Sequence, residues 1–402
     1  MTKSVIFHPF LVVAGGSERI TLEEERFLRQ NNFDTTIITF EYKDIFDYAY
    51  QPQVKVIQSK NKNFILKVIS RIRQLRRLVK EIIPEVIDVC DFEGCLYIYF
   101  ATLFTEYKYF TQIPSSGLDE IDTFGKHLVS YGISGRIFKS GYKRIRLSTK
   151  GHEANLPEKF LHKRLVEHLF SDLIGFLMYK AVRKAQNVYV LSNQVKWELK
   201  QLFNRDAIVL KGAYRRDIFD YKPQIDLRKK LNIGNKKIIL SVCRLVPKKR
   251  VDWIIKAFGM LVREGLNDIV LIVGGTGQSA DELKKLAIDL GVEKDVVFAG
   301  FIKEQELYDY YYHCDVFVSA DYADFDITTY MAIAFDKNIV WTIDNELELA
   351  LAQSGKIFPA ELSPEGLCHS MLQALDRNSL MRKYNSFDYT WENYFGTMYG
   401  AI

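Results

Sequence analysis

The strongest constraint on the fold is the alternation of short apolar runs with helix-like segments along most of the chain. In the first half, Ser4–His8, Thr35–Thr39 and Val86–Cys90 are rich in β-branched residues, and residues 17–30 and 67–82 between them have helical spacing. Strands buried on both faces read as continuous apolar runs, and they occur mainly in parallel sheets covered by helices. The first half is therefore predicted to be a parallel α/β domain.

The second half repeats this alternation more clearly. Strand-like runs at 237–243, 269–273, 296–298 and 316–319 each precede a helix-like segment. A chain of 402 residues is long enough for two domains with separate cores. The predicted fold class is α/β, with two consecutive Rossmann-like, doubly wound parallel sheets, whose ligands bind beyond the carboxyl ends of the strands.

A loop at residues 212–223 marks the predicted boundary between the two domains. Residues 1–217 are predicted to form the N-terminal domain and residues 218–385 the C-terminal domain. The aromatic segment Thr390–Tyr399 is helix-like. We expect this helix, within residues 386–402, to pack back on the N-terminal domain.

Composition narrows the class of protein. The five cysteines are scattered and show no zinc-ligand spacing, which predicts a reducing compartment and no metal. No stretch approaches eighteen uncharged apolar residues, and the N-terminus lacks the pattern of a signal peptide, so we expect a protein that is cytoplasmic or peripheral on the cytoplasmic face of the membrane. A net charge of +5 does not by itself indicate nucleic-acid binding.

The first candidate site is a pair of glycines, Gly15 and Gly16, which follow a strand-like run and open a helix. Glycine lets the backbone approach a phosphate, and Ser17 behind the pair could cap the helix, whose exposed N–H groups attract negative charge. Short glycine motifs are also common as plain strand-to-helix turns. Both interpretations stay open.

A second candidate site follows the strand-like run at 237–243. Arg244 and Lys249 leave the carboxyl end of this strand in the loop before the next helix. Two cations at such an edge can neutralise a diphosphate, the arginine as a planar fork and the lysine as a point charge. A solvated basic loop is the alternative, but the position at the end of the strand favours anion binding.

The order of the motifs resembles the retaining family 4 glycosyltransferases with the GT-B fold. The resemblance covers essentially the whole chain and is strongest over 237–334. The motifs that carry it are Gly15-Gly16-Ser17-Glu18-Arg19, Arg244-Leu245-Val246-Pro247-Lys248-Lys249, Val273-Gly274-Gly275-Thr276-Gly277, Val297-Phe298-Ala299-Gly300-Phe301 and Cys314-Asp315-Val316-Phe317-Val318-Ser319. Taken alone, Val273–Gly277 more often only closes a strand-to-helix connection.

The resemblance implies two Rossmann-like domains that face each other across a cleft. The N-terminal domain would bind the acceptor and the C-terminal domain a nucleoside-diphosphate sugar of the UDP or GDP type, without a metal. Arg244 and Lys249 would hold the diphosphate, the Phe301 loop would lie against the nucleobase, and the two N-terminal glycines would approach the phosphate and the reacting sugar. The positions implied for donor binding are Gly15, Gly16, Arg244, Lys249, Phe301, Thr328 and Thr329.

The chain departs from the family at its hallmark, two glutamates separated by seven residues. The matching positions are Ala323 and Met331, and Asp326 stands at a position where the family usually has a glycine. A thioether cannot replace the carboxylate that normally accepts hydrogen bonds from the ribose. Asp324, or Asp321 if the loop is shifted, is the candidate to replace the first glutamate as a catalytic contact to the transferred sugar, although a carboxylate beside a diphosphate repels it unless it turns away.

The acceptor side departs as well, because Gln112 occupies a position where the family usually has a histidine. Glutamine donates and accepts hydrogen bonds but does not titrate. In retaining transfer the leaving diphosphate and the donor's own oxygens can carry the proton, so the loss of the histidine need not abolish activity. Gln112 is therefore kept as the second candidate catalytic residue.

Two basic stretches with interleaved apolar residues predict an anionic partner. The first contains Lys62, Lys67, Arg71, Arg73, Arg76, Arg77 and Lys80, and the second contains Arg136, Lys139, Lys143, Arg144, Arg146 and Lys150. Such helices can rest on an anionic membrane, whereas a packed helix with a solvated basic face is an equal alternative for 67–82. No aromatic motif for stacking nucleic-acid bases accompanies them, so we expect no nucleic-acid partner.

Two functions follow from these patterns. The first is a glycosyltransferase that moves a hexose-type sugar, with retention, from a nucleoside diphosphate to a glycan or lipid-linked acceptor. The second is a catalytically inactive GT-B protein that serves as a non-catalytic partner or glycan-binding subunit. Arg244 and Lys249 favour the first function, and Ala323, Asp326 and Met331 favour the second.

Overall fold

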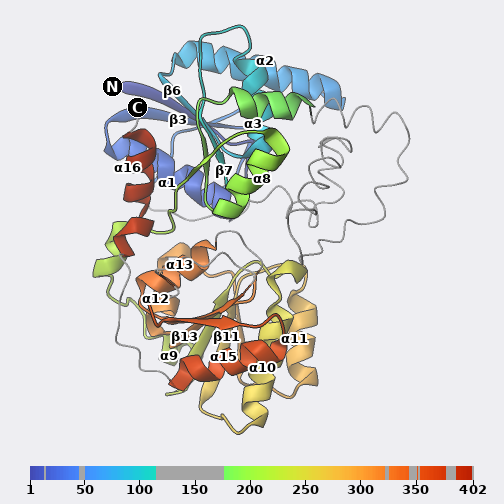
Figure 1. Cartoon of the computed structure of the whole chain (residues 1–402), viewed down its shortest axis with the longest axis vertical. Helices are drawn as coiled ribbons and strands as arrows, with labels where there is room; N and C mark the ends of the chain where they lie inside the picture. The colour runs from blue at the N-terminus through green and yellow to red at the C-terminus, as the bar shows by residue number, and fades with distance from the viewer. Residues whose placement is uncertain are drawn as a thin grey trace. The chain divides into compact units, whose positions relative to one another are not determined.

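The computed structural model describes residues 1–12, 15–44, 50–114, 176–321, 326–343, 351, 354–376 and 386–400. The chain forms two compact units, of which the first ends at Lys211 and the second begins at Gly212 (Figure 1). The predicted boundary, between 217 and 218, lies a few residues further along. Each unit is built around parallel sheets, which confirms the predicted α/β class.

The first unit has a four-stranded parallel sheet in the order β5-β3-β1-β6. Its strands are β1 (Thr2–Phe7), β3 (Phe33–Thr39), β5 (Val54–Val56) and β6 (Val86–Val89). A parallel bridge between Cys90 and Gln112 continues it into a second sheet in the order β7-β8-β9. These strands are β7 (Thr111–Ile113), β8 (Val188–Val190) and β9 (Ile208–Val209), and a short pair, β2 (Phe10–Leu11) and β4 (Glu41–Tyr42), lies apart.

The helices of this unit with described bounds are α1 (Gly16–Gln30), α2 (Phe64–Ile82), α3 (Asp91–Ala101) and α8 (Asn193–Phe203), and residues 176–184 are helical as well. Helix α2 begins at Phe64 rather than at the predicted Lys67, because the side chain of Asn63 accepts a hydrogen bond from Leu66 N at 3.2 Å and caps the helix. Helix α3 was not predicted, because its apolar residues are not confined to one face. It lies in the core and buries Cys95 and Ile98.

The second unit has a six-stranded, fully parallel sheet in the order β12-β11-β10-β13-β14-β15. Its strands are β10 (Lys237–Val242), β11 (Ile269–Gly274), β12 (Val296–Gly300), β13 (Val316–Ser319), β14 (Asn338–Thr342) and β15 (Ile357–Ala360). Counted along the chain, this is the order 3-2-1-4-5-6 of doubly wound dinucleotide-binding sheets. The order reverses between β10 and β13, which makes the crevice beyond their carboxyl ends the expected ligand site.

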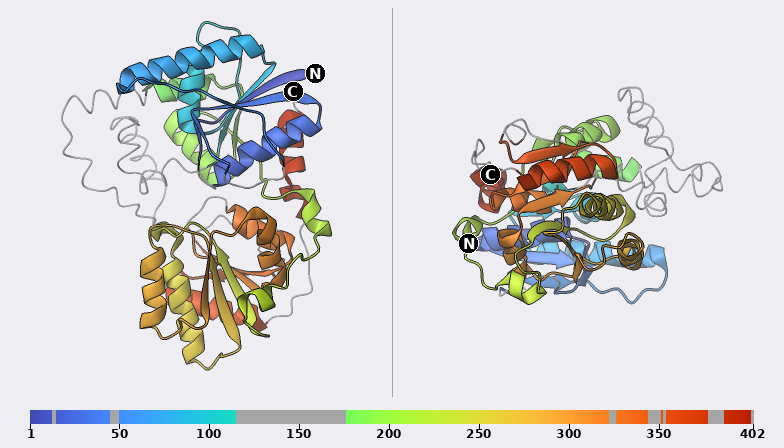
Figure 2. Two further views of the ribbon diagram at one scale, coloured as in Figure 1. Left: turned by 180° about the vertical axis from the view of Figure 1, so that it is seen from behind. Right: turned by 90° about the horizontal axis from the view of Figure 1, so that it is seen from below.

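Helices cover this sheet, and the core on one face is formed with α10, α11 and α15 (Figure 2). In its described residues, the second unit has the helices α9 (Leu227–Leu231), α10 (Val251–Arg263), α11 (Ala280–Asp289), α12 (Glu304–His313), α13 (Ile327–Ala334), α15 (Pro364–Asp376) and α16 (Trp391–Tyr399). Short 3-10 turns are η2 (Arg216–Asp220), η3 (Pro247–Lys249) and η4 (Ser386–Tyr389).

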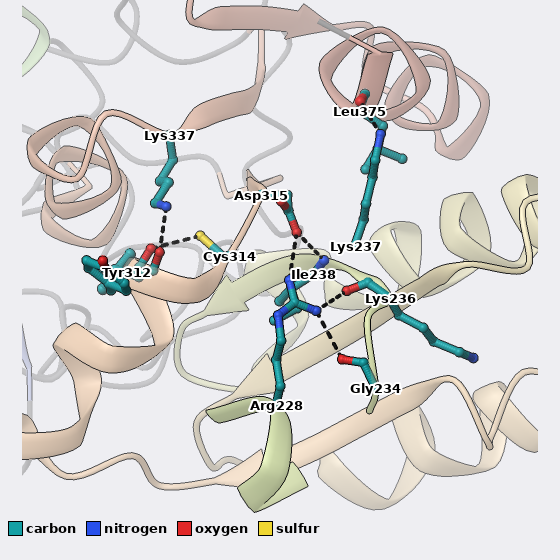
Figure 3. A network of polar contacts seen from close by, with 11 residues as sticks. Arg228, Gly234, Lys236, Lys237, Ile238, Tyr312, Cys314, Asp315, Lys337 and Leu375 are labelled. Atoms are coloured by element: carbon teal, nitrogen blue, oxygen red, sulfur yellow. Dashed lines mark hydrogen bonds and ion pairs between the residues drawn. The ribbon is translucent and has the colours of Figure 1, made fainter. Parts of the chain in front are cut away.

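Polar side chains fasten the amino edge of this sheet. Arg228 of α9 donates to the carbonyl oxygens of Gly234 and Lys236 at 3.3 and 2.5 Å, and its guanidinium lies 3.7 Å from the carboxylate of Asp315 (Figure 3). Asp315 in turn accepts a hydrogen bond from Ile238 N at 2.7 Å. The network ties α9 to the starts of β10 and β13. Arg228 therefore has a structural role.

Helix α16 packs against the segment that begins the second unit. Trp391 N donates to Tyr214 O at 2.9 Å, and a Cβ added to Gly212 would lie 2.5 Å from the Trp391 ring. Any residue larger than glycine at 212 would therefore displace the indole. The predicted docking of residues 386–402 on the first domain stays a prediction.

Candidate functional site

The loop that carries Arg244 is held by its neighbour in the sheet. Cys243 N donates to Gly274 O at 3.1 Å, and Leu245 N donates to Thr276 O at 2.9 Å. Gly275 has φ +122°, and a Cβ there would lie 1.8 Å from Cys243 O. The Gly274–Gly277 turn thus closes a strand-to-helix connection and also admits the backbone of the β10 loop, a contact that the sequence did not reveal.

Arg244 is exposed at this edge. Within the part of the chain that the structure describes, no hydrogen bond or ion pair occupies its guanidinium. Burial raises the pKa of the neighbouring Cys243 thiol to about 12, against the lowering effect of Lys249, while Asp326 adds to the rise and Arg244 lowers it. The charges of Lys249, Asp326 and Arg244 therefore all act on the Cys243 thiol.

Lys249, the second predicted phosphate ligand, already has an acidic partner. Its ammonium group forms an ion pair with the carboxylate of Asp321, which follows β13. Asp321 is only 2% exposed, and the Lys249 side chain is mostly buried as well. The sequence suggested that an aspartate in this loop could intrude on the donor site, and Asp321 does contact the lysine.

Asp326 occupies the amino end of α13. Its carboxylate accepts hydrogen bonds from Thr328 N at 3.1 Å and from the hydroxyl groups of Thr328 and Thr329 at 2.6 and 2.7 Å. The hydroxyl of Ser319, at the end of β13, donates to it as well, at 2.9 Å. Both threonines predicted to contact the donor therefore direct their hydroxyls to this aspartate, which caps the helix.

The remaining predicted positions of the second unit differ in accessibility. Phe301 follows β12 and is 51% exposed, so its ring is accessible at the carboxyl edge of the sheet. Met331 is buried in α13. Ala323 and the candidate catalytic Asp324 lie outside the described residues.

In the first unit, Gly15 is the residue that caps α1, in an extended conformation, and Gly16 is the first residue of the helix. The expectation that Ser17 caps this helix is wrong. Its hydroxyl instead donates to the carboxylate of Glu18 at 2.9 Å, because Ser17 already lies inside the first turn. The glycines are nonetheless at the amino end of a fifteen-residue helix, as predicted.

Gln112, the candidate catalytic amide, lies in β7 and is 2% exposed. Its Nε2 donates to Glu24 at 2.7 Å and also to Asp88. Burial raises the pKa of Asp88 to about 6, and hydrogen bonds with Gln112 and Glu24 oppose the rise. Sequence reasoning missed this buried cluster, although an aspartate inside the apolar run Val86–Val89 is a recognisable signal.

The first basic stretch is only partly solvated. The Arg71 guanidinium lies over the Phe40 ring at 4.1 Å, and Arg76 donates to the carbonyl oxygens of Phe100, Ala101 and Leu103 at 2.7 to 3.0 Å. These two cations therefore have structural roles and are not part of a solvated basic face. The second basic stretch, 136–150, lies outside the described residues.

The start of α2 presents apolar side chains to solvent. The exposed residues are Phe64, Ile65, Leu66 and Ile69. Lys60, Lys62 and Lys67 lie beside them in the sequence. Among the described helices, none has the length and apolar character needed to cross a bilayer.

Comparisons with known proteins agree with this architecture. Residues 223–388 match the family model for glycosyl transferases group 1. A GDP-mannose-dependent alpha-(1-6)-phosphatidylinositol monomannoside mannosyltransferase from Mycolicibacterium smegmatis is 27% identical over 183 residues, 44% of each chain. Mannosylfructose-phosphate synthase from Agrobacterium fabrum is 33% identical over 124 residues, 29% of this chain and 27% of that protein. The matches span less than half the length of these relatives.

Solved structures match the whole chain at low sequence identity. HepE from Anabaena, in complex with UDP and glucose, has a TM-score of 0.72 at 14% identity and covers 100% of this chain and 99% of that one. Sucrose-phosphate synthase from Thermosynechococcus elongatus has a TM-score of 0.73 at 12% identity, with the same coverage. Residues 223–388 are thus similar to the group 1 glycosyl transferases, and the fold of the chain is of the GT-B type.

Proposed function

We propose that this protein transfers a hexose-type sugar from a nucleoside-diphosphate donor, with retention, to a glycan or lipid-linked acceptor. The observation that carries the proposal is the position of Arg244. It stands exposed at the point where the strand order of the second unit reverses, on a loop fixed by the Gly274–Gly277 turn. A rigid loop with a planar cation at this edge suits a diphosphate.

The predicted site residues of the two units have separate proposed roles. The Arg244 guanidinium binds the diphosphate oxygens, and the exposed Phe301 ring lies against the nucleobase. Gly15 and Gly16 admit the donor phosphate and the reacting sugar at the start of α1. No protein nucleophile is needed for retention if the leaving diphosphate accepts the acceptor's proton. Asp324 and Gln112 are kept as the proposed contacts to the reacting sugars.

Calorimetric titration tests the donor assignment. The relatives and solved structures are named with GDP-mannose and with UDP, so UDP, GDP and their sugars are the probes. We expect micromolar binding of one of them and loss of that binding in Arg244→Ala. Lys229→Ala is the control, because it removes an exposed cation from α9, near the opposite edge of the sheet. Equal binding by wild type and Arg244→Ala would contradict the assignment.

A lipid-linked acceptor requires contact with a membrane, and we propose that the start of α2 provides it on the cytoplasmic face. Exposed apolar side chains with lysines beside them suit an anionic bilayer surface, to which each cation contributes about 1 kcal/mol.

Vesicle co-sedimentation tests the membrane contact. Binding to phosphatidylglycerol vesicles should exceed binding to phosphatidylcholine vesicles, fall with salt, and fall further in Ile65→Ser. Ile288→Ser, which changes an equally exposed isoleucine on α11, is the matched control. Binding that ignores both lipid charge and the Ile65 change would exclude this surface.

The second candidate is a non-catalytic GT-B protein, and specific contacts favour it. The Asp321 and Asp326 carboxylates occupy Lys249 and the α13 terminus, and a buried thioether stands at position 331. Product analysis with each nucleotide sugar separates the two functions. Release of UDP or GDP that depends on an acceptor supports the enzyme, whereas a wild-type protein that binds no nucleotide supports the non-catalytic partner.

A further inference from the structure

Two aspartates of this chain occupy positions at which the second unit would otherwise attract phosphate. A helix amino terminus and a lysine at the carboxyl edge of a parallel sheet are both ordinary anion sites. Here Asp326 caps α13, and Asp321 pairs with Lys249. Both carboxylates follow β13, whereas Arg244 and Lys249 follow β10, so the opposing charges meet at the reversal of strand order.

The two aspartates differ in how they are held. Asp326 accepts hydrogen bonds from three hydroxyl groups and one backbone N–H, and all of them come from the end of β13 and the start of α13. It is therefore part of the structure of the helix terminus. Asp321 instead joins two loops, because its partner Lys249 lies in η3, beyond the other central strand.

Burial makes the Asp321 charge effective. The residue is 2% exposed, so water screens it little, and its field acts strongly on charges in the crevice. A phosphate that approached Lys249 would meet a fixed negative charge on the same ammonium group. The lysine cannot give its full attraction to the ligand while it remains paired.

We propose that Asp321 competes with the donor diphosphate for Lys249 and so sets the affinity of this chain for nucleoside diphosphates. The inference rests on the proposed function of this edge as the donor site. Arg244 supplies the principal attraction for the diphosphate, and the Asp321–Lys249 pair is the specificity-determining element that weakens it. Asp321 acts through the lysine and is a positioning residue rather than a catalytic one.

Nucleotide titration of Asp321→Asn tests the proposal. The amide keeps the shape of the side chain and removes its charge. We expect UDP or GDP to bind at least about tenfold more tightly than to wild type, which corresponds to about 1.4 kcal/mol. Uridine and guanosine, which carry no phosphate, should bind both proteins equally, whereas a merely structural change would alter nucleoside and nucleotide binding together.

The matched control is Asp295→Asn. Asp295 also pairs with a lysine, Lys236, but it precedes β12 at the opposite edge of the sheet. Its removal changes the net charge equally and should leave UDP and GDP affinity at the wild-type value. Asp321→Ser provides a second variant if the asparagine protein does not fold, with thermal unfolding as the check on folding.

The outcomes separate this inference from the proposed function. Tighter nucleotide binding by the Asp321 variants, with wild type also binding, supports both. Tighter binding by the variants with no binding by wild type supports the inference and moves the protein to the non-catalytic class. Equal or weaker binding by folded variants overturns the inference and leaves the transferase standing if wild type binds. No nucleotide binding by any of these proteins overturns both.

Discussion

Single residues decide which charges of this protein are available to a ligand. Arg244 and Lys249 look equivalent in the sequence, yet the structure leaves one exposed and pairs the other with Asp321. The sequence predicted the loop that carries them, because a basic stretch directly after a buried strand is a local pattern. It could not predict the pairing, since the two partners are distant in the chain and meet only when β10 and β13 lie side by side.

The cap formed by Asp326 gives a stability prediction at this scale. Asp326→Ala removes the cap and leaves hydroxyl groups of Ser319 and Thr329 without their acceptor, so we expect a loss of about 2–4 kcal/mol in the free energy of unfolding. Urea unfolding measures it. Asp226→Ala, which removes the exposed cap of α9, is the control and should cost clearly less. Equal losses would show that the buried hydroxyl groups do not depend on Asp326.

Glu25 gives a prediction about pH. Burial raises its pKa to about 7, although Gln53 N and Arg29 oppose the rise. A carboxyl whose pKa is higher in the folded protein binds a proton on folding between about 4.5 and 7, so wild type loses stability as pH rises through that window. The free energy of unfolding of Glu25→Gln, relative to that of wild type, should therefore rise by an amount on the order of 1 kcal/mol as pH increases from 5 to 8.

Chemical denaturation at several pH values measures this difference. His8, whose pKa burial lowers to about 4, titrates in both proteins and cancels in the comparison. A constant difference between Glu25→Gln and wild type across the range would show that Glu25 keeps its charge in the folded protein.

At the scale of elements, prediction from sequence succeeded where a pattern was strongly periodic and failed where it was not. Helix α1 and strand β13 lie within a residue of the predicted segments. Helix α3 was missed because tertiary burial on all sides removes the amphipathic signal, and β7 was missed because three residues are too few to show alternation. The role of the Gly274–Gly277 turn was missed because it depends on a neighbouring loop.

That turn supports a prediction about the donor site. Gly275→Ala would force a Cβ into Cys243 O, so we expect the Arg244 loop to shift, stability to fall by about 2–4 kcal/mol, and nucleotide affinity to fall at least tenfold. Gly291→Ala, at φ +71° with open space around the new Cβ, is the matched control for backbone strain alone. It should cost about 1 kcal/mol and leave nucleotide affinity unchanged. Calorimetry and urea unfolding together distinguish the two effects.

At the scale of the whole molecule, the first and last described segments of the second unit pack against each other. Trp391 of α16 packs on Gly212, the first residue of the unit, and its ring stacks on Phe395 with centroids 5.8 Å apart. Sequence patterns predicted the helix but not this partner, because contacts between distant segments leave no local period. The division into two parallel α/β units was predictable, because the buried strands of each unit repeat as apolar runs in the sequence.

Removal of this indole should weaken the second unit as a whole. Trp391 is almost fully buried, so Trp391→Ala should cost about 3–5 kcal/mol in the free energy of unfolding. Limited proteolysis should then cut the second unit faster while the fragments of the first unit persist. Tyr312→Ala, which truncates a half-exposed aromatic on α12, is the comparison. Unchanged proteolysis of Trp391→Ala would mean that α16 does not stabilise the unit.

The β10 loop is anchored through peptide groups, from Cys243 and Leu245 to Gly274 and Thr276. Peptide anchors are indifferent to the side chain that stands between them. Arg244 can therefore be replaced by lysine, glutamine or glutamate while the backbone hydrogen bonds that hold the loop stay intact. In this protein, the preference for one ligand over another could change by a single codon without any cost to folding.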